Sequence, residues 1–362
     1  MKKILSFLLG AVLAFGLVSC DNLSDDLNLH DAQPAPLGLM GIDTGICVPF
    51  EFENGDVLTD VTVEYMTFGT PIYDENGFIK NAVVYCHGSL GSYSSVKKLA
   101  PLLGENDAFD ENKYFFICIS ALGSPGSCSP STTDLKNRFP KYSINDVVNF
   151  QKEFLAQKFS INHVLGMIGN SMGGFVALTS AINFQDYADF IICGVSSYKV
   201  AGHDFILSHF VNEIIESDPD YNRGELTYSL NRTLRIASLA EFNFGLSKEA
   251  LRNMSKAELH SEFENFGNES IETDIYDLKY CNEACMYFDV ENELDKIKSK
   301  TLIIACKQDP HFPPELDAIP MSQMIDGSQL IIMDSDLGHL CFNELDTISN
   351  ELKEFMGEFN DC

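Results

Sequence analysis

Three side chains in this sequence have the chemical types and the chain order needed for nucleophilic acyl transfer: Ser171, Asp309 and His339. A serine hydroxyl is a weak nucleophile at neutral pH and becomes reactive when a histidine takes its proton. A carboxylate that accepts a hydrogen bond from the same imidazole holds it in one tautomer and stabilises its cation. The three residues therefore predict a catalytic triad with Ser171 as nucleophile, His339 as base and Asp309 as the orienting group.

Ser171 stands at the centre of a Gly-x-Ser-x-Gly pentapeptide, residues 169–173. The apolar run 163–168 predicts a buried strand before it, and the run 175–182 predicts a helix after it. The pentapeptide alone arises by chance too often to carry the argument. A strand, a tight turn at serine and a helix together are typical of a nucleophile elbow, which lifts the hydroxyl above the sheet edge. The N–H groups at the start of such a helix would point at the same place.

Asp309 and His339 each follow an apolar run late in the chain. These runs, 301–306 and 329–333, predict two more strands. Open α/β sheets place their sites beyond the carboxyl ends of parallel strands, so both side chains are expected near Ser171. The order Ser…Asp…His along the chain is the one that α/β hydrolases use.

Other ionisable residues compete for these roles. His311 is two residues from Asp309, too close in the chain to meet that carboxylate and also reach the serine. Asp334 and Asp336 precede the expected base, and we expect them to shape its loop. His87 precedes the serine in the chain, against the order expected of the base, so we expect it to brace its own loop.

The remaining apolar segments predict the scaffold. Further buried strands are expected at 81–86, 114–119 and 190–195, with a helix at 144–159. An alternation of strands and helices predicts an α/β-hydrolase fold with a mostly parallel central sheet flanked by helices. Residues 57–68 alternate like an antiparallel strand, and a last helix is expected at 344–355.

The pattern changes between residues 199 and 298, where long helical periodicities replace the strands. We expect this segment to be a helical lid inserted into a core made of residues 45–198 and 299–362.

The loop after the strand at 81–86 is rich in small residues and is the expected source of one oxyanion-hole N–H. The residue after the nucleophile, Met172, supplies the other.

The N-terminus predicts export. Residues 1–19 combine Lys2 and Lys3 with a short apolar stretch, which is typical of a signal peptide. The stretch ends Leu17-Val18-Ser19-Cys20, which resembles the lipobox of bacterial lipoproteins, so we expect Cys20 to carry lipid and anchor an exported protein to a bacterial membrane. An ordinary secretory signal is the alternative. Residues 20–44 would then form a flexible tether.

The composition of the chain limits the kinds of molecule that it is expected to bind. The chain has 362 residues, 45% of them hydrophobic, and a formal net charge of −29. Such acidity disfavours a nucleic-acid partner, and it disfavours an anionic membrane surface except through a lipid anchor. Cys281 and Cys285 are spaced i, i+4, but no His or second Cys pair stands at zinc-site spacing. We expect no metal, no cofactor and a small-molecule acyl substrate.

Taken together, these motifs resemble the homoserine O-acetyltransferase-like group of α/β hydrolases, from about residue 68 to residue 339. The resemblance rests on His87…Gly91-Ser92, Gly126-Ser127…Pro130-Ser131, Phe139…Ser143-Ile144…Asp146, Ser171-Met172-Gly173-Gly174, Asp218-Pro219-Asp220, Asp309…Phe312-Pro313-Pro314 and Gly338-His339. It implies the triad Ser171, Asp309 and His339, and it implies the N–H groups of Ser89 and Met172 as oxyanion donors. It also implies that two copies could pair through the lid as a homodimer.

The chain departs from this group at one position in the lid. The acetyltransferases carry an arginine six residues before the Asp-Pro step, thought to grip the carboxylate of the amino acid, and this chain has Asn212 there. A neutral amide cannot replace a bidentate guanidinium, and Glu213 beside it would further disfavour an anionic acceptor. An exported protein would also not meet acetyl-CoA, which is cytosolic.

Three functions therefore remain open from the sequence. The first is an exported serine hydrolase of an ester or similar acyl compound, in which water releases the acyl-enzyme formed on Ser171. The second is a homoserine O-acetyltransferase that uses acetyl-CoA. The third is a non-catalytic lipoprotein that binds a ligand in the same pocket.

Overall fold

A computed structural model describes residues 41–43, 49–59, 61–224 and 227–359 of the chain. The expected signal peptide, Cys20 and the tether up to residue 40 lie outside the described residues. Among those described, no helix is both long enough and apolar enough to cross a bilayer.

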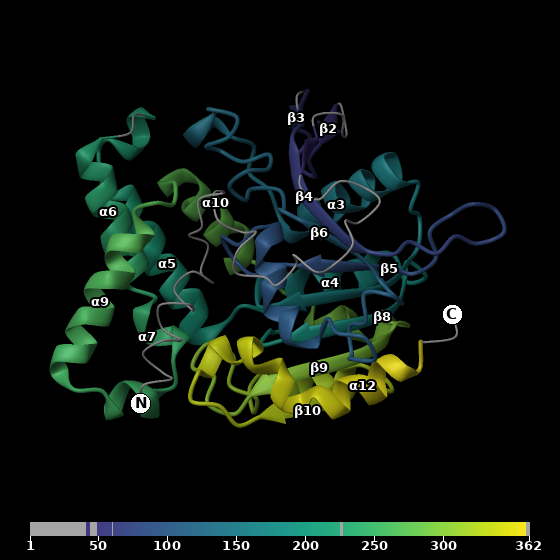
Figure 1. The fold of residues 1–362 in the computed structure, drawn as a ribbon. Coiled ribbons are helices and arrows are strands. Elements are labelled where there is room, and N and C mark those ends of the chain that lie inside the picture. Colours follow the sequence, from purple (N-terminus) through teal and green to yellow (C-terminus); the bar gives the residue numbers. More distant parts are fainter. Residues whose placement is uncertain (1–40, 44–48, 60, 225–226, 360–362) are drawn as a thin grey trace.

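An eight-stranded sheet forms the centre of the molecule (Figure 1). Its strands lie in the order β1-β4-β6-β5-β7-β8-β9-β10. Pairing is antiparallel for β1–β4 and β4–β6 and parallel for every other neighbouring pair. The strands are β1 (Gly41–Asp43), β4 (Val63–Gly69), β5 (Ala82–Cys86), β6 (Phe115–Ile119), β7 (Val164–Asn170), β8 (Ala188–Gly194), β9 (Lys300–Cys306) and β10 (Gln329–Met333).

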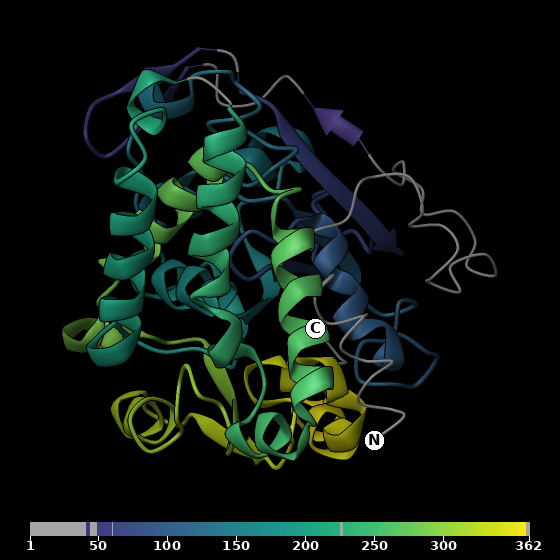
Figure 2. The same ribbon diagram turned by 90° about the vertical axis from the view of Figure 1, so that its left-hand side faces the viewer.

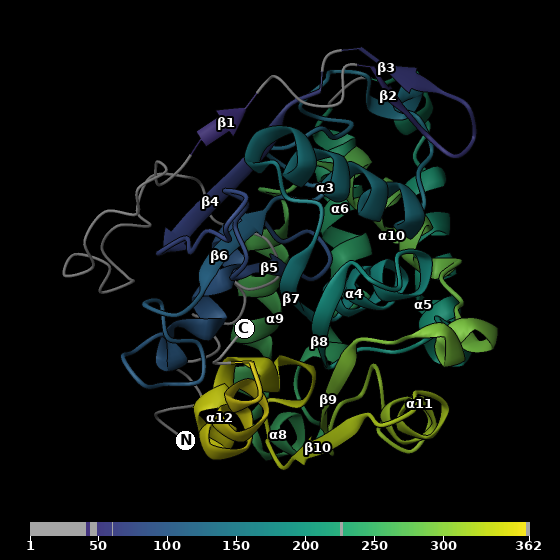
Figure 3. The same cartoon turned by 90° about the vertical axis from the view of Figure 1, so that its right-hand side faces the viewer.

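Helices cover both faces of this sheet, which explains why its inner strands are almost continuously apolar. One face packs against α3 (Ile144–Phe159), α4 (Met172–Asn183) and α11 (Ala318–Met324), and the other against the 3₁₀ segment η3 (Tyr93–Leu102) and α12 (Ser349–Gly357) (Figure 3). The mostly parallel sheet flanked by helices that the sequence predicts is therefore confirmed.

Two expected elements differ in detail. The segment 57–68 is not one strand: β3 (Val57–Leu58) pairs with β2 (Phe50–Glu51) in a separate small sheet, and only β4 joins the main one. The expected last helix begins as the 3₁₀ segment η7 (Gly338–Ile348), is interrupted at Glu344 and continues as α12. Alternation alone could not show that the chain changes partner sheet within the first segment.

The segment between β8 and β9 is helical throughout its regular described elements. It contains α5 (Gly202–Glu216), α6 (Tyr228–Leu239), α7 (Phe242–Gly245), α8 (Lys248–Asn253), α9 (Lys256–Ser270) and α10 (Ile275–Met286). Helices α5, α6 and α9 pack side by side away from the sheet (Figure 2). Helices α5 and α6 share a small apolar core around Val211, Ile215 and Leu234 with the start of α10, whereas Cys281 and Cys285 of α10 belong to the main core beside the sheet.

Candidate active site

Ser171 lies in the turn between β7 and α4, where the backbone is held in a conformation that L-residues seldom adopt. Its φ of 54° and ψ of −124° place it in the left-handed half of conformational space. A Cβ on Gly169 would lie 2.0 Å from the Gly173 carbonyl oxygen, and a Cβ on Gly173 would lie 2.0 Å from the Cys86 carbonyl oxygen. Both glycines of the pentapeptide are therefore required sterically, and they force the strained turn that presents the serine hydroxyl.

The structure brings the three residues expected to form the triad into one hydrogen-bonded series. His339 Nε2 lies 3.1 Å from Ser171 Oγ, and its Nδ1 lies 2.9 Å from Asp309 Oδ2 and 3.2 Å from Oδ1. The Asp309 side chain is fully buried and the His339 side chain is 7% exposed. When Nδ1–H donates to the carboxylate, Nε2 is left as an acceptor for the serine proton, which is the arrangement that a general base needs.

Asp309 is kept ionised despite its burial. Burial by itself would raise the pKa of this carboxyl, but the neighbouring His339 and the backbone hydrogen bonds outweigh it, so the pKa lies below its ordinary value. Its Oδ1 accepts hydrogen bonds from the backbone N–H groups of His311 at 2.8 Å and Phe312 at 3.2 Å. These donors fix the carboxylate as well as stabilising its charge, so it can hold the His339 ring in place.

Two segments next to Ser171 could supply backbone N–H donors, the start of α4 and the loop after β5. Met172 is the first residue of α4, so its N–H is one of those without an acceptor inside the helix. Gly88 packs against the elbow from the loop after β5, since a Cβ on it would be 3.5 Å from Ser171 Cβ. Ser89 follows in that loop and lines the same pocket. Donors so placed could stabilise an oxyanion formed at a carbonyl carbon attacked by Ser171.

His87 is not a competitor for the base. It is buried in the loop after β5, with Nδ1 2.7 Å from the Gly88 carbonyl oxygen, while Nε2 accepts a hydrogen bond of 2.9 Å from the Ala121 N–H. Burial lowers the pKa of His87 to about 4, and the nearby Lys98 acts in the same direction. The neutral ring thus ties the loop to the chain after β6. Asp334 is also excluded from the triad, because it is exposed and pairs with Lys307.

Because His87 is buried and neutral, we expect the unfolding free energy to depend on pH. The folded pKa of about 4 lies below the ordinary 6.5, so the unfolded chain binds the proton more tightly and stability falls as the pH drops from 6.5 to about 4. For this residue we expect a loss of about 2 kcal/mol between pH 7.5 and pH 5. Urea unfolding at the two pH values measures this loss. The unfolding free energy of the wild type should exceed that of His87→Gln at pH 7.5, and the difference should be about 2 kcal/mol smaller at pH 5.

The control for this prediction is His260→Gln, because His260 is exposed on α9. That substitution should leave the pH dependence of the unfolding free energy unchanged. If the unfolding free energies of the wild type and His87→Gln differ by the same amount at both pH values, His87 is not a neutral, buried ring.

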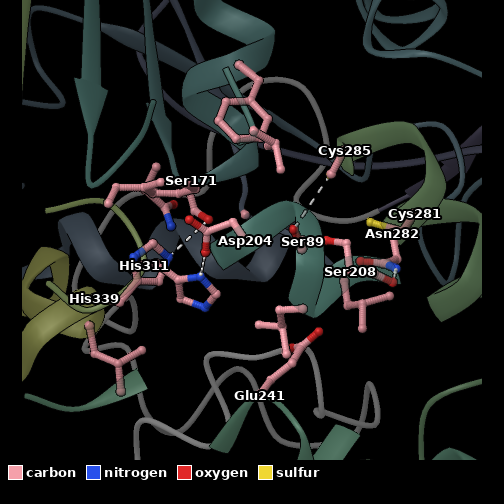
Figure 4. A pocket seen from close by; sticks show the side chains of 18 of the residues that line it. Ser89, Ser171, Asp204, Ser208, Glu241, Cys281, Asn282, Cys285, His311 and His339 are labelled. Atoms are coloured by element: carbon pink, nitrogen blue, oxygen red, sulfur yellow. Dashed lines mark hydrogen bonds and ion pairs between the residues drawn. The ribbon is translucent and has the colours of Figure 1, made fainter. Parts of the chain in front are cut away.

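The pocket above Ser171 also contains an ion pair that the sequence did not predict. His311 Nδ1 lies 2.7 Å from Oδ1 of Asp204 in the first turn of α5, and its ring centroid lies 4.7 Å from that of His339. Figure 4 shows Ser171, Asp204 and the two histidines gathered on one side of the pocket, with Glu241 nearby. No sequence spacing links Asp204 to His311, because their contact exists only once the helical segment packs against the sheet edge.

Asn212 is buried, and both ends of its amide are engaged. Its Nδ2 lies 3.2 Å from Met286 Sδ, and its Oδ1 accepts a hydrogen bond of 2.8 Å from Asn282 Nδ2. The expectation that Glu213 would repel an anion in the site is not supported, because this residue is exposed and lies near His209 on the outer side of α5. Position 213 follows position 212 by one residue, and so it points to another side of the helix.

Comparisons with known proteins agree with this geometry. Residues 81–342 match the family model described as alpha/beta hydrolase fold. The chain is 42% identical to a probable acyltransferase of Methanothermobacter thermautotrophicus over 85% of this chain and 95% of that one. It is 26% identical to a homoserine O-acetyltransferase of Nostoc punctiforme over 82% of this chain and 90% of the relative.

A solved structure is similar in both sequence and fold. The acetylester hydrolase of Corynebacterium glutamicum superposes with a TM-score of 0.76 at 25% identity, covering 88% of this chain and 96% of that one. The expected α/β-hydrolase fold and the likeness to homoserine O-acetyltransferases are both confirmed by these matches. The extent of the family match and the 42% identity show that this chain is an enzyme of the α/β-hydrolase family, among its acyltransferases and esterases.

Proposed function

We propose that the protein hydrolyses short acyl esters through an acyl-enzyme on Ser171. The observation that carries the proposal is the series from the Asp309 carboxylate through His339 to the serine hydroxyl, with Nε2 3.1 Å from Oγ. Similarity to an acetylester hydrolase over most of both chains supports the ester class.

The proposed reaction has two halves. Ser171 Oγ attacks the ester carbonyl carbon while His339 Nε2 takes its proton, and the N–H groups of Ser89 and Met172 face the resulting oxyanion. The tetrahedral intermediate collapses, the C–O bond to the alcohol breaks, and His339 returns the proton to the leaving alcohol. Water then attacks the acyl-enzyme with His339 again as base, which releases the carboxylic acid and restores the serine.

Transfer to homoserine is the second candidate, and the lid disfavours it. The position that holds arginine in the acetyltransferases is Asn212 here, a buried neutral amide already bonded to Asn282. Neither Asp204 nor Glu241, which line the pocket, would attract the carboxylate of an amino acid. We therefore assign water, rather than an amino acid, as the acyl acceptor.

The test uses one purified protein and two assays. With p-nitrophenyl acetate and butyrate we expect steady release of p-nitrophenol and of the free acid in equal amounts. With acetyl-CoA and homoserine we expect no release of free CoA. Release of CoA that depends on homoserine would instead establish the acetyltransferase, and inactivity in both assays together with no labelling by a fluorophosphonate would favour a binding protein.

We further propose that this hydrolase is exported and anchored to the membrane by lipid on Cys20. The support is the pattern of residues 1–20, a basic start and an apolar stretch that ends Leu17-Val18-Ser19-Cys20. Cells grown with a clickable palmitate analogue should yield labelled wild-type protein in the membrane fraction, whereas Cys20→Ser should be unlabelled and released from membranes by washing. Cys47→Ser, a nearby cysteine outside the motif, is the control and should stay labelled. Unlabelled wild-type protein would contradict the anchor.

A further inference from the structure

Besides the triad and the thiols of Cys281 and Cys285, four ionisable side chains line the pocket above Ser171: Lys98, Asp204, Glu241 and His311. Asp204 and His311 pair with each other at 2.7 Å, so neither is left to neutralise a charge on a substrate. Lys98, from η3, also lines the pocket, but burial and the neighbouring charge of Lys97 lower its pKa to about 8, which makes it a weaker cation than an ordinary lysine. Glu241 is the remaining anion, and it comes from the lid.

The Glu241 carboxylate has no hydrogen-bond or ion-pair partner within the described parts of the chain. The residue lies at the junction of α6 and α7, where its backbone carbonyl accepts from the Phe244 N–H at 2.9 Å. Its side chain extends towards the pocket that Ser171 faces (Figure 4). Burial raises the pKa of this carboxyl and the charge of His311 opposes that effect. Glu241 is half-buried, so its carboxylate has lost part of its hydration without gaining a partner in the described chain, and a bound cation would compensate for that loss.

The location of Glu241 assigns it to the alcohol side of an ester. Its carboxyl interacts electrostatically with His311, whose ring centroid is 4.7 Å from that of His339. The leaving alcohol must lie close to His339 Nε2, because it takes its proton from that atom. Glu241 lines the same pocket as His311 and His339, so an alcohol part that extends from His339 across this pocket would reach it. At the position where the acetyltransferases would offer a cation to an anionic acceptor, the chain has the bonded amide of Asn212.

We propose that Glu241 is a specificity residue that binds a positively charged group on the alcohol part of the substrate. The substrate class is then acyl esters of amino alcohols, with a primary or quaternary ammonium a few atoms from the ester oxygen. This inference rests on the proposed ester hydrolysis for its setting, and it adds which esters are preferred. A carboxylate–ammonium contact shielded from water selects strongly against both neutral and anionic analogues.

Two esters of nearly the same shape test the proposal: acetylcholine, and 3,3-dimethylbutyl acetate, in which carbon replaces the charged nitrogen. For the wild type we expect kcat/KM to favour acetylcholine by about tenfold. Glu241→Gln keeps the shape of the side chain and removes its charge, so the ratio of kcat/KM for acetylcholine to that for the neutral ester should fall to about one. The matched control is Glu213→Gln, which removes an exposed carboxylate from the same helical segment and should leave the preference intact.

The possible failures are distinguishable. Equal rates on the two esters by the wild type, or a preference that survives Glu241→Gln, would overturn the inference and leave ester hydrolysis standing. Faster cleavage of the anionic ester 3-acetoxypropionate would overturn it in favour of Lys98. If no ester is cleaved, the proposed function fails, and calorimetry on Ser171→Ala still tests the site: choline should bind about tenfold more tightly than 3,3-dimethylbutan-1-ol, and adding Glu241→Gln should remove that difference. Equal binding of the two alcohols would overturn the inference.

Discussion

Replacing Ser171 with alanine is expected to lower kcat for p-nitrophenyl acetate by on the order of 10⁴-fold or more, and to abolish labelling by a fluorophosphonate probe. The alanine removes the only atom that can form the acyl-enzyme, while the oxyanion donors and the pocket remain. The substitution removes no side-chain contact that the fold needs, because it is the Ser171 backbone that bonds to Gly194 and Ser196. The melting temperature should therefore stay close to that of the wild type.

The matched control is Ser261→Ala, an exposed serine on α9. It should keep both turnover and labelling. If Ser171→Ala still hydrolyses the ester at a rate comparable with the wild type, the proposed acyl-enzyme is wrong, whatever the geometry of the elbow. Labelling of the wild type at another residue, located by mass spectrometry of the modified peptide, would contradict it independently.

The meeting of Ser171, Asp309 and His339 in space could be predicted from the sequence, because strong local rules place each of them. The pentapeptide around Ser171 can be recognised since its glycines are sterically required, with 2.0 Å approaches that no other residue tolerates. Asp309 and His339 follow two apolar runs that form the parallel strands β9 and β10, the first buried and the second at the edge of the sheet. Once three parallel strands of one sheet are recognised, their carboxyl ends must lie at the same edge of that sheet, whatever the side-chain packing.

The pocket residues that come from the segment between β8 and β9 could not be predicted in the same way. Asp204 lies in α5 and Glu241 just before α7, and helical periodicity predicts that a helix exists but not which face meets the pocket. Their neighbours, such as His311, are far away in sequence and are set by how the helical segment docks on the core. The inference from Glu213 was wrong for this reason: adjacency in sequence to Asn212 did not place it in the site. The way such helices dock on the core decides which of their side chains reach the pocket, and local sequence patterns do not reveal that docking.

Asp309→Asn is expected to lower kcat by about 10⁴-fold, although the substitution changes a single atom of a residue that does not touch the substrate. The wild-type carboxylate accepts from His339 Nδ1 at 2.9 Å, which leaves Nε2 free of a proton. An asparagine amide can donate to Nδ1 instead, and the imidazole then presents N–H to the serine and cannot act as its base. The measurement is kcat on p-nitrophenyl acetate near pH 7.5, with Asp334→Asn as the control, since Asp334 is an exposed partner of Lys307 and should tolerate the change.

Asp309→Asn should also change how the unfolding free energy depends on pH. Because the pKa of Asp309 in the folded protein lies below its ordinary value, its ionised form stabilises the fold above the ordinary carboxyl range, and this contribution is lost as the pH falls through the folded pKa. The unfolding free energy of the wild type should therefore exceed that of Asp309→Asn at pH 7, and the gap should narrow towards pH 3. A variant that is as active as the wild type would remove Asp309 from the triad. A variant that is inactive yet shows a gap independent of pH would instead mean that the carboxylate orients His339 without being held ionised by it.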